Sequence, residues 1–446
     1  MVNQFLKYAV PSALAMFISS LYTVIDGIFV GQGVGDSALA AINIVLPFTV
    51  VLFGIANMLA VGGGALVSKN VGAEDTDKAV NVFRQVFKLL LIISAIASIV
   101  CIVFTEYIVK LLGATDNLMP LSVDYLRYYA IFCIPNLIGI VLNSFVRNDN
   151  RPKLAMISTI SGAITNIILD YIFIFIFGLG IKGAAIATGL GQIVTVVVLL
   201  PHFIRKRGNL SFGSVKLDKF TIKSFLSIGF PSFFAQASFS IIVLLHNIAL
   251  AKFIGEIGIS TYSIINYITT NIYMVLLGLT FGAQPLISYN FGRKDGEKML
   301  KFYQITCKSS LVVSILAAII CYVFGRQIVG IFTTDPKIIK LSYDAIRISC
   351  LIYIIAGINL NRLVYYQAIE KPNVSNLICV FRAMLFLPIC LLILPKILGI
   401  SGIWSSMLVS EGITFIIITL IANIKTNTKK SLDESVEKTM EEVMGM

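Results

Sequence analysis

The apolar residues of this chain come in twelve long runs that short polar segments separate. The runs lie near residues 8–30, 38–66, 86–109, 124–146, 154–177, 184–204, 225–251, 258–290, 303–323, 341–365, 374–395 and 400–423. Most exceed the roughly 20 residues that a helix needs to cross the hydrocarbon core of a bilayer. They do not alternate between apolar and polar positions, as the strands of a β-barrel would. The pattern predicts an all-α integral membrane protein with twelve transmembrane helices.

The second half of the chain repeats the first about 220 residues later. ALVSKNVGAEDTDKA (65–79) returns as PLISYNFGRKDGEKM (285–299), and LSVDYLR (121–127) returns as LSYDAIR (341–347). Near the end the shift is 219, so that Gly180 and Gly183 correspond to Gly399 and Gly402. Because each half has six runs, an even number, both halves enter the membrane from the same side. We expect two six-helix bundles that a pseudo-twofold axis along the membrane normal relates.

The longest polar interval between the runs, residues 202–222, joins the two halves. We therefore expect an N-terminal lobe over residues 1–204 and a cytoplasmic linker over 205–223. A C-terminal lobe follows over 224–424, and a polar cytoplasmic tail over 425–446 completes the chain.

Composition and charge support a membrane location. Hydrophobic residues make up 57% of the chain and charged residues 13%, whereas about a quarter of a soluble domain is charged. Lys and Arg concentrate in the even-numbered loops, and this bias predicts that these loops and both termini are cytoplasmic. It also accounts for the net charge of +12, so nucleic-acid binding is not indicated. The first run is too long for a cleavable signal peptide, and we expect a multi-pass protein of the cell (plasma or inner) membrane.

Polar residues that occur inside the runs of only one half are the best functional candidates. Tyr22 lies four residues before Asp26, and Asn166 lies four residues before Asp170, so each pair occupies one face of its helix. Asn143 and Thr188 add polar groups in the fourth and sixth runs. Among the equivalent positions of the second half, only His246, opposite Asp26, can titrate.

Two carboxylates inside the bilayer predict an ion-binding site. A charge at mid-span costs about 2.5–3.5 kcal/mol even on the lenient insertion scale. The pair relaxes by binding a proton, or by binding a hard cation such as Na⁺, to which Asn143, Asn166 and Thr188 add neutral oxygen ligands. The alternatives are a helix–helix hydrogen bond for the Asn and Thr side chains and an interfacial role for Asp26. No HExxH, P-loop or GxSxG motif is present, and neither an enzyme nor an organic cofactor is predicted.

Several segments are similar to those of a known family. They are Pro11 with Tyr22-x-x-x-Asp26, continuing as VIDGIFVGQGVGDSALAAINI, then VSKNVGAED with its echo ISYNFGRKD, and NSFVRNDNRPK after the fourth run. Together with the twelve runs and the duplication, they resemble the prokaryotic multidrug and toxic compound extrusion (MATE) family over nearly the whole chain.

The resemblance implies a secondary antiporter that exports small cationic amphipathic drugs against inward H⁺ or Na⁺ by alternating access. It implies a cation site of the N-terminal lobe and a bend of the first helix at Pro11. The matching site residues are Asp26, Asn143, Asn166, Asp170 and Thr188, with Tyr22 one turn before Asp26. The chain has His246 opposite Asp26, which argues against a second coupling site in the C-terminal lobe. We expect a monomer in contact with membrane lipids.

Other polar residues of the runs have two readings each. We expect Arg147, at the end of the fourth run, to extend toward the membrane interface. Arg362, Arg382 and Glu411 either form a structural ion pair or extend to the membrane interface, or they belong to a substrate site. His246 is either a proton relay or a hydrogen-bonded helix contact. His246, Gln236, Gln284 and Arg362 are the candidates for substrate contact in the C-terminal lobe.

The main alternative function is a flippase for a lipid-linked oligosaccharide or polyprenyl precursor, on a related fold. Such a protein needs a basic central cavity for phosphate, whereas the acids of the N-terminal half favour a cation. A channel is less favoured, because two duplicated lobes suit a rocking motion better than a fixed pore.

Overall fold

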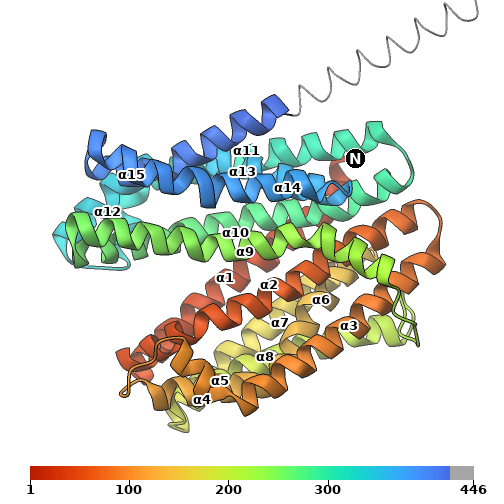
Figure 1. Ribbon diagram of the computed structural model, residues 1–446, viewed down its shortest axis with the longest axis horizontal. Coiled ribbons are helices and arrows are strands. Elements are labelled where there is room, and N and C mark those ends of the chain that lie inside the picture. The colour runs from red at the N-terminus through yellow and green to blue at the C-terminus, as the bar shows by residue number, and fades with distance from the viewer. Residues whose placement is uncertain (422–446) are drawn as a thin grey trace, which may run out of the picture.

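The computed structural model describes residues 1–421, and their regular structure is entirely helical (Figure 1). The predicted tail over 425–446 lies outside the described residues. The elements of the N-terminal half are α1 (Val2–Gly33), α2 (Asp36–Gly72), α3 (Thr76–Val103), α4 (Thr105–Leu111), α5 (Met119–Ile131), α6 (Cys133–Asn148), α7 (Pro152–Asp170), the π-helix η1 (Tyr171–Ile176) and α8 (Gly180–Ile204).

The C-terminal half repeats this order. Its elements are α9 (Lys219–Ile254), α10 (Glu256–Gly292), α11 (Gly296–Gly330), α12 (Pro336–Ser349), α13 (Ile352–Ala368), α14 (Pro372–Cys379), the π-helix η2 (Val380–Leu385), α15 (Phe386–Leu398) and a last helix Ile400–Ile421.

Ten helices are long and apolar enough to cross a membrane, and two bent pairs bring the number to twelve. The bent pairs are α5 with α6, at 54°, and α12 with α13, at 50°. They are the fourth span of one half and the fourth span of the other, so the bend is part of the duplicated scaffold. The prediction of an all-α membrane protein with two halves of six spans is confirmed.

The duplicated loop motif builds the same turn in both halves. Asp75 begins α3 by accepting a hydrogen bond from the backbone N–H of Lys78, and Asp295 begins α11 by accepting one from Lys298, both at 3.0 Å. Each carboxylate satisfies an otherwise free N–H of the first helical turn. The bond from the Lys298 backbone also holds the pKa of Asp295 below its usual value. The Asp of the repeated motif therefore has the same structural role in both halves.

The two lobes pack against each other at one end and diverge toward the other (Figure 1). The contacts are symmetric, because α1 packs on α10 and α2 packs on α9. Their backbones approach so closely that a Cβ at Gly62 would collide with the carbonyl of Phe225. A Cβ at the equivalent Gly282 would likewise crowd the backbone of Ala9. We call this the closed end of the molecule, and it carries the turns at 73–75 and 293–295.

The segment between the lobes is fixed to the N-terminal lobe. It runs from the end of α8 at Ile204 to the start of α9 at Lys219, so α9 takes up the last residues of the linker predicted over 205–223. The Asp149 carboxylate accepts hydrogen bonds from the backbone of Asn209 and Leu210 and is 2.8 Å from the His202 ring. This buried contact ties the segment to the ends of α6 and α8.

Candidate functional site

The structure brings Asp26 and Asp170 together. Asp26 lies near the end of α1, and Asp170 is the last residue of α7, which packs along α1. Their carboxyl groups are close enough to share a hydrogen bond. Both oxygens of Asp170 and one of Asp26 are buried without a hydrogen-bond donor among residues 1–421. Because buried acceptors are normally satisfied, this pair is short of a proton or a cation.

Neutral oxygens surround the acid pair. The amide nitrogen of Asn166, one turn before Asp170, donates to the hydroxyl of Thr188 in α8 at 3.4 Å. This contact leaves the amide oxygen of Asn166 buried and without a partner in the described chain. Carboxylate, amide and hydroxyl oxygens are the ligands that a hard cation takes. The donor set fits Na⁺ as well as a shared proton.

Two tyrosines complete the cluster. Tyr22 lies one turn before Asp26 and is close enough to both acids to interact with them electrostatically. Tyr125 of α5 is also close to Tyr22 and both acids. Tyr125 was not among the residues predicted from the sequence. The second half has Ala345 at the equivalent position, so Tyr125 is another polar residue that only one half carries.

Asn143 does not join this cluster. Its amide nitrogen donates to the Ala155 carbonyl at 2.8 Å and to the hydroxyls of Ser158 and Thr159 at 3.2 and 3.0 Å. These partners lie in the first turns of α7, and Thr159 precedes Asn166 by about two turns, or about 10 Å along the helix. Asn143 makes the helix–helix contact that was the alternative to ion binding.

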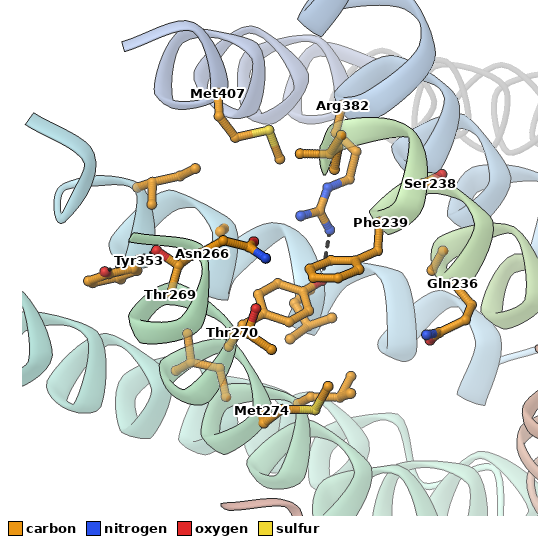
Figure 2. A pocket seen from close by; sticks show the side chains of 18 of the residues that line it. Gln236, Ser238, Phe239, Asn266, Thr269, Thr270, Met274, Tyr353, Arg382 and Met407 are labelled. Carbon is orange, nitrogen blue, oxygen red and sulfur yellow. Dashed lines mark hydrogen bonds between the residues drawn. The ribbon is translucent and has the colours of Figure 1, made fainter. Parts of the chain in front are cut away.

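A cavity opens on the other side of the lobe boundary, mainly within the C-terminal lobe (Figure 2). Met16, Phe53 and Asn57 reach it from α1 and α2, and the rest of its lining comes from the C-terminal lobe. Of the four residues suggested for substrate contact, Gln236 and His246 line it. The His246 ring stacks on Tyr262 with the centroids 4.9 Å apart.

The other two suggested residues have structural partners. Gln284 donates to the Val61 carbonyl at 3.1 Å, a contact that joins the two lobes. Arg362 donates to the Phe415 carbonyl at 3.0 Å and covers the Phe415 ring at 4.4 Å. Neither residue lines the cavity.

The C-terminal lobe contains a buried ion pair, and the contact between the lobes contains a buried arginine without an acidic partner in the described chain. Arg382 and Glu411 are 2.5 Å apart and almost fully buried. Arg147 was expected to extend to the membrane interface, and this expectation is wrong: the residue is 7% exposed and covers the Phe281 ring of α10. It is buried because the end of α6 lies against α10 of the other lobe. No carboxylate within residues 1–421 forms an ion pair with it.

Known proteins resemble this chain over nearly its full length. A family model described as MatE matches residues 11–172 and again residues 231–392. The multidrug export protein MepA of Staphylococcus saprophyticus is 27% identical over 421 residues, which cover 93% of this chain and 92% of the relative. Its counterpart in Staphylococcus haemolyticus is 26% identical over 435 residues, with 96% of both chains covered.

Solved structures share the fold. An outward-facing multidrug resistance MATE family transporter of the MOP superfamily superimposes with a TM-score of 0.91 at 23% identity, over 96% of this chain and 97% of that one. A MOP superfamily transporter from Pyrococcus furiosus gives a TM-score of 0.89 at 22% identity, over 96% of both chains.

Proposed function

Because the chain belongs to the MatE family of membrane transporters, we propose that it is a secondary active multidrug exporter. It moves cationic amphipathic compounds out of the cell in exchange for H⁺ or Na⁺. The contact between the carboxyl groups of Asp26 and Asp170 carries this proposal, because both oxygens of Asp170 and one of Asp26 lack a donor in the described chain. Both curated relatives above are multidrug export proteins, which supports the substrate class.

Helix α1 links the ion site to the organic substrate. Asp26 lies toward one end of this helix, Met16 lines the cavity, and Pro11 is buried where α1 packs on α10. Pro11 lacks an N–H, so the helix bends there at a lower cost than elsewhere. Neutralising the acid pair favours that bend, which narrows the cavity and expels the substrate. Since the two ligands bias one conformational equilibrium, each changes the affinity of the other by the same factor.

The predicted orientation supports export. If the basic even-numbered loops are cytoplasmic, the closed end faces the cytoplasm and the cavity opens outward. The small cation then reaches the acids from outside, as an antiporter driven by an inward gradient requires. The same orientation places the segment that joins the two lobes in the cytoplasm.

A flippase for a polyprenyl precursor is the second candidate. Arg382 lines the cavity, and a phosphate group would find a cation there. A flippase has no use, however, for two carboxyl groups without donors beside Tyr22. Movement of a fluorescent polyprenyl phosphate across vesicles that contain the protein would favour this candidate.

Transport in proteoliposomes tests the antiporter. We expect a pH gradient or a Na⁺ gradient to drive ethidium movement by the wild-type protein. Asp26→Asn and Asp170→Asn should each reduce the driven rate to below about a tenth, since each removes a titratable group that only function requires. Asp116→Asn, an exposed residue between α4 and α5, is the matched control and should transport normally.

Two outcomes would reject the scheme. Normal driven transport by both Asn variants would remove the acids from the mechanism. Ethidium that moves under neither gradient, in vesicles with correctly folded protein, would remove antiport itself.

A further inference from the structure

The cavity of the C-terminal lobe has a distinctive charge pattern. Its polar lining is mostly neutral, with Gln236, Asn266, Thr269 and Thr270 among it, and it includes no Asp, Glu or Lys. Arg382 is the lining residue with a permanent charge, and its guanidinium points into the cavity beside Phe239 (Figure 2). A cavity built for a bare cation would not place a guanidinium there.

The partners of Arg382 orient this charge. One terminal nitrogen lies 2.5 Å from the Glu411 carboxylate, and the other donates to the Tyr273 hydroxyl at 2.9 Å. Glu411 is fully buried behind Arg382, does not line the cavity, and accepts a 2.6 Å hydrogen bond from Asn359. The ion pair therefore presents its positive end to the cavity. Because most of the side chains around it are apolar, that end attracts an anion more strongly than it would at the protein surface.

The duplicated scaffold does not require this network. With the shift of 220 residues, Asn359 and Arg382 correspond to Gly139 and Gly162. With the shift of 219 near the end, Glu411 corresponds to Gln192, which lies against Gly139 as Glu411 lies against Asn359. The N-terminal lobe thus forms the same helix contacts without charge, so the charges serve something other than the fold.

We propose that the cavity binds the anionic group, such as a carboxylate, of a zwitterionic amphipathic substrate, with Arg382 as the residue that recognises it. This proposal rests on the exporter function above and narrows its substrate class. A guanidinium binds a carboxylate through two parallel hydrogen bonds. The aromatic side chains of Tyr273, Phe239 and Trp404 in the same lining provide faces for the ring system of the substrate.

A matched pair of dyes tests the proposal on the purified full-length protein. Rhodamine 110 has a free carboxylate, and rhodamine 123 is its methyl ester, so the two differ in one charge. Binding is measured by dye polarisation. Trp404 lines the cavity and is the one tryptophan of the chain, so quenching of its fluorescence shows that the dye occupies this cavity. We expect the free acid to bind about tenfold more tightly, as a charge-assisted hydrogen bond allows.

Substitutions then assign the preference to Arg382. The double variant R382Q/E411Q removes both charges together and keeps polar groups of similar shape, which avoids an unpaired buried charge. It should bind both dyes with equal affinity, close to that of the wild type for the ester. R382K keeps the charge and should retain most of the preference. Arg326→Gln, at an exposed site on α11, is the control and should leave the preference unchanged.

Several outcomes would overturn the proposal. The proposal is wrong if the wild-type protein binds the ester as tightly as the free acid, or more tightly. It is also wrong if R382Q/E411Q keeps a tenfold preference for the free acid. If only rhodamine 123 quenched Trp404, rhodamine 110 would bind outside this cavity, and the proposal would be wrong. Driven transport of rhodamine 123 by the wild-type protein is measured in parallel. If no transport is seen, the exporter function is contradicted, whereas the binding result still stands.

Discussion

The two lobes share a scaffold but hold their buried charges in opposite ways. In the N-terminal lobe, Asp26 and Asp170 meet as two acids with no basic partner in the described chain. In the C-terminal lobe, Glu411 lies 2.5 Å from Arg382. Unbalanced charge of one sign is stable in a membrane only when a mobile ion completes it, whereas a balanced pair is permanent. On the proposed function, this difference separates an exchangeable ion site from a fixed binding group.

The π-helices mark both sites. Asp170 directly precedes η1, and Arg382 lies within η2. At the shift of 220 residues, η2 corresponds to residues 160–165, so the two π-helices begin eleven residues, or about 16 Å, apart along their spans. A π-helical turn carries an extra residue and often occurs at functional sites. The fifth span of each lobe thus contains a π-helical turn next to its buried charge, but the two turns lie at different positions along the span.

Breaking the C-terminal pair should have the largest effect on stability. Glu411→Gln leaves the Arg382 guanidinium buried without its counter-charge, and the loss of one partner of such a pair costs about 3–5 kcal/mol. We expect a large drop in the thermal unfolding midpoint of the purified protein. The double variant R382Q/E411Q should recover most of it.

The N-terminal pair provides the matched control. Asp170→Asn removes a like-charge contact, so we expect it to leave the unfolding midpoint unchanged or higher. Equal destabilisation by Glu411→Gln and Asp170→Asn would mean that both acids are structural, and the contrast between the lobes would not hold.

The sequence predicted the spans because the bilayer dictates the length and polarity of each one. It also placed Tyr22 with Asp26 and Asn166 with Asp170, since residues four apart share a helix face. It did not predict that Asn143 faces the start of α7 or that Gln284 joins the lobes. An ion pair among Arg362, Arg382 and Glu411 was one of two readings, and the sequence did not decide which arginine pairs with Glu411. These contacts depend on the rotation and tilt of each helix against its neighbours, which packing determines and hydropathy does not.

Arg147 tests whether an unbalanced cation of the N-terminal lobe is also kept for function. Its Nε has no hydrogen-bond partner within residues 1–421, and the residue is 7% exposed. Arg147→Met should therefore raise stability by about 2 kcal/mol, because it removes the cost of burying an unpaired charge. The driven transport rate should fall several-fold. Arg207→Met, in the exposed linker segment, should change neither quantity, and a loss of stability in Arg147→Met would show a structural role.

The duplicated prolines test whether the lobes bend differently. Pro11 of α1 and Pro231 of α9 occupy equivalent positions, but of these two helices only α1 carries an acid of the proposed ion site. Pro11→Ala restores a backbone hydrogen bond and stiffens the helix, so the driven transport rate should fall about tenfold at unchanged membrane abundance. Pro231→Ala should reduce the rate less. Similar losses for both variants would mean that these prolines shape the scaffold and have no separate role in coupling.

The smallest effect concerns the ion pair that crosses between the lobes at the closed end. Lys69 of α2 lies 2.7 Å from Glu370, and both side chains are partly exposed, at 34% and 26%. The duplicated positions, Tyr289 and Asn150, carry no charge, so this pair has no symmetric counterpart.

A partly exposed pair contributes at most about 1 kcal/mol, so Lys69→Ala should change the opening equilibrium several-fold without unfolding the protein. Amide hydrogen exchange in α10, around Gly278 and Gly282, should rise because these turns pack on α1 only while that end is closed. The charge-swapped variant Lys69→Glu/Glu370→Lys should restore slow exchange. If it exchanges as fast as Lys69→Ala, the lobes are held together by the glycine contacts, and charge plays no part in keeping that end closed.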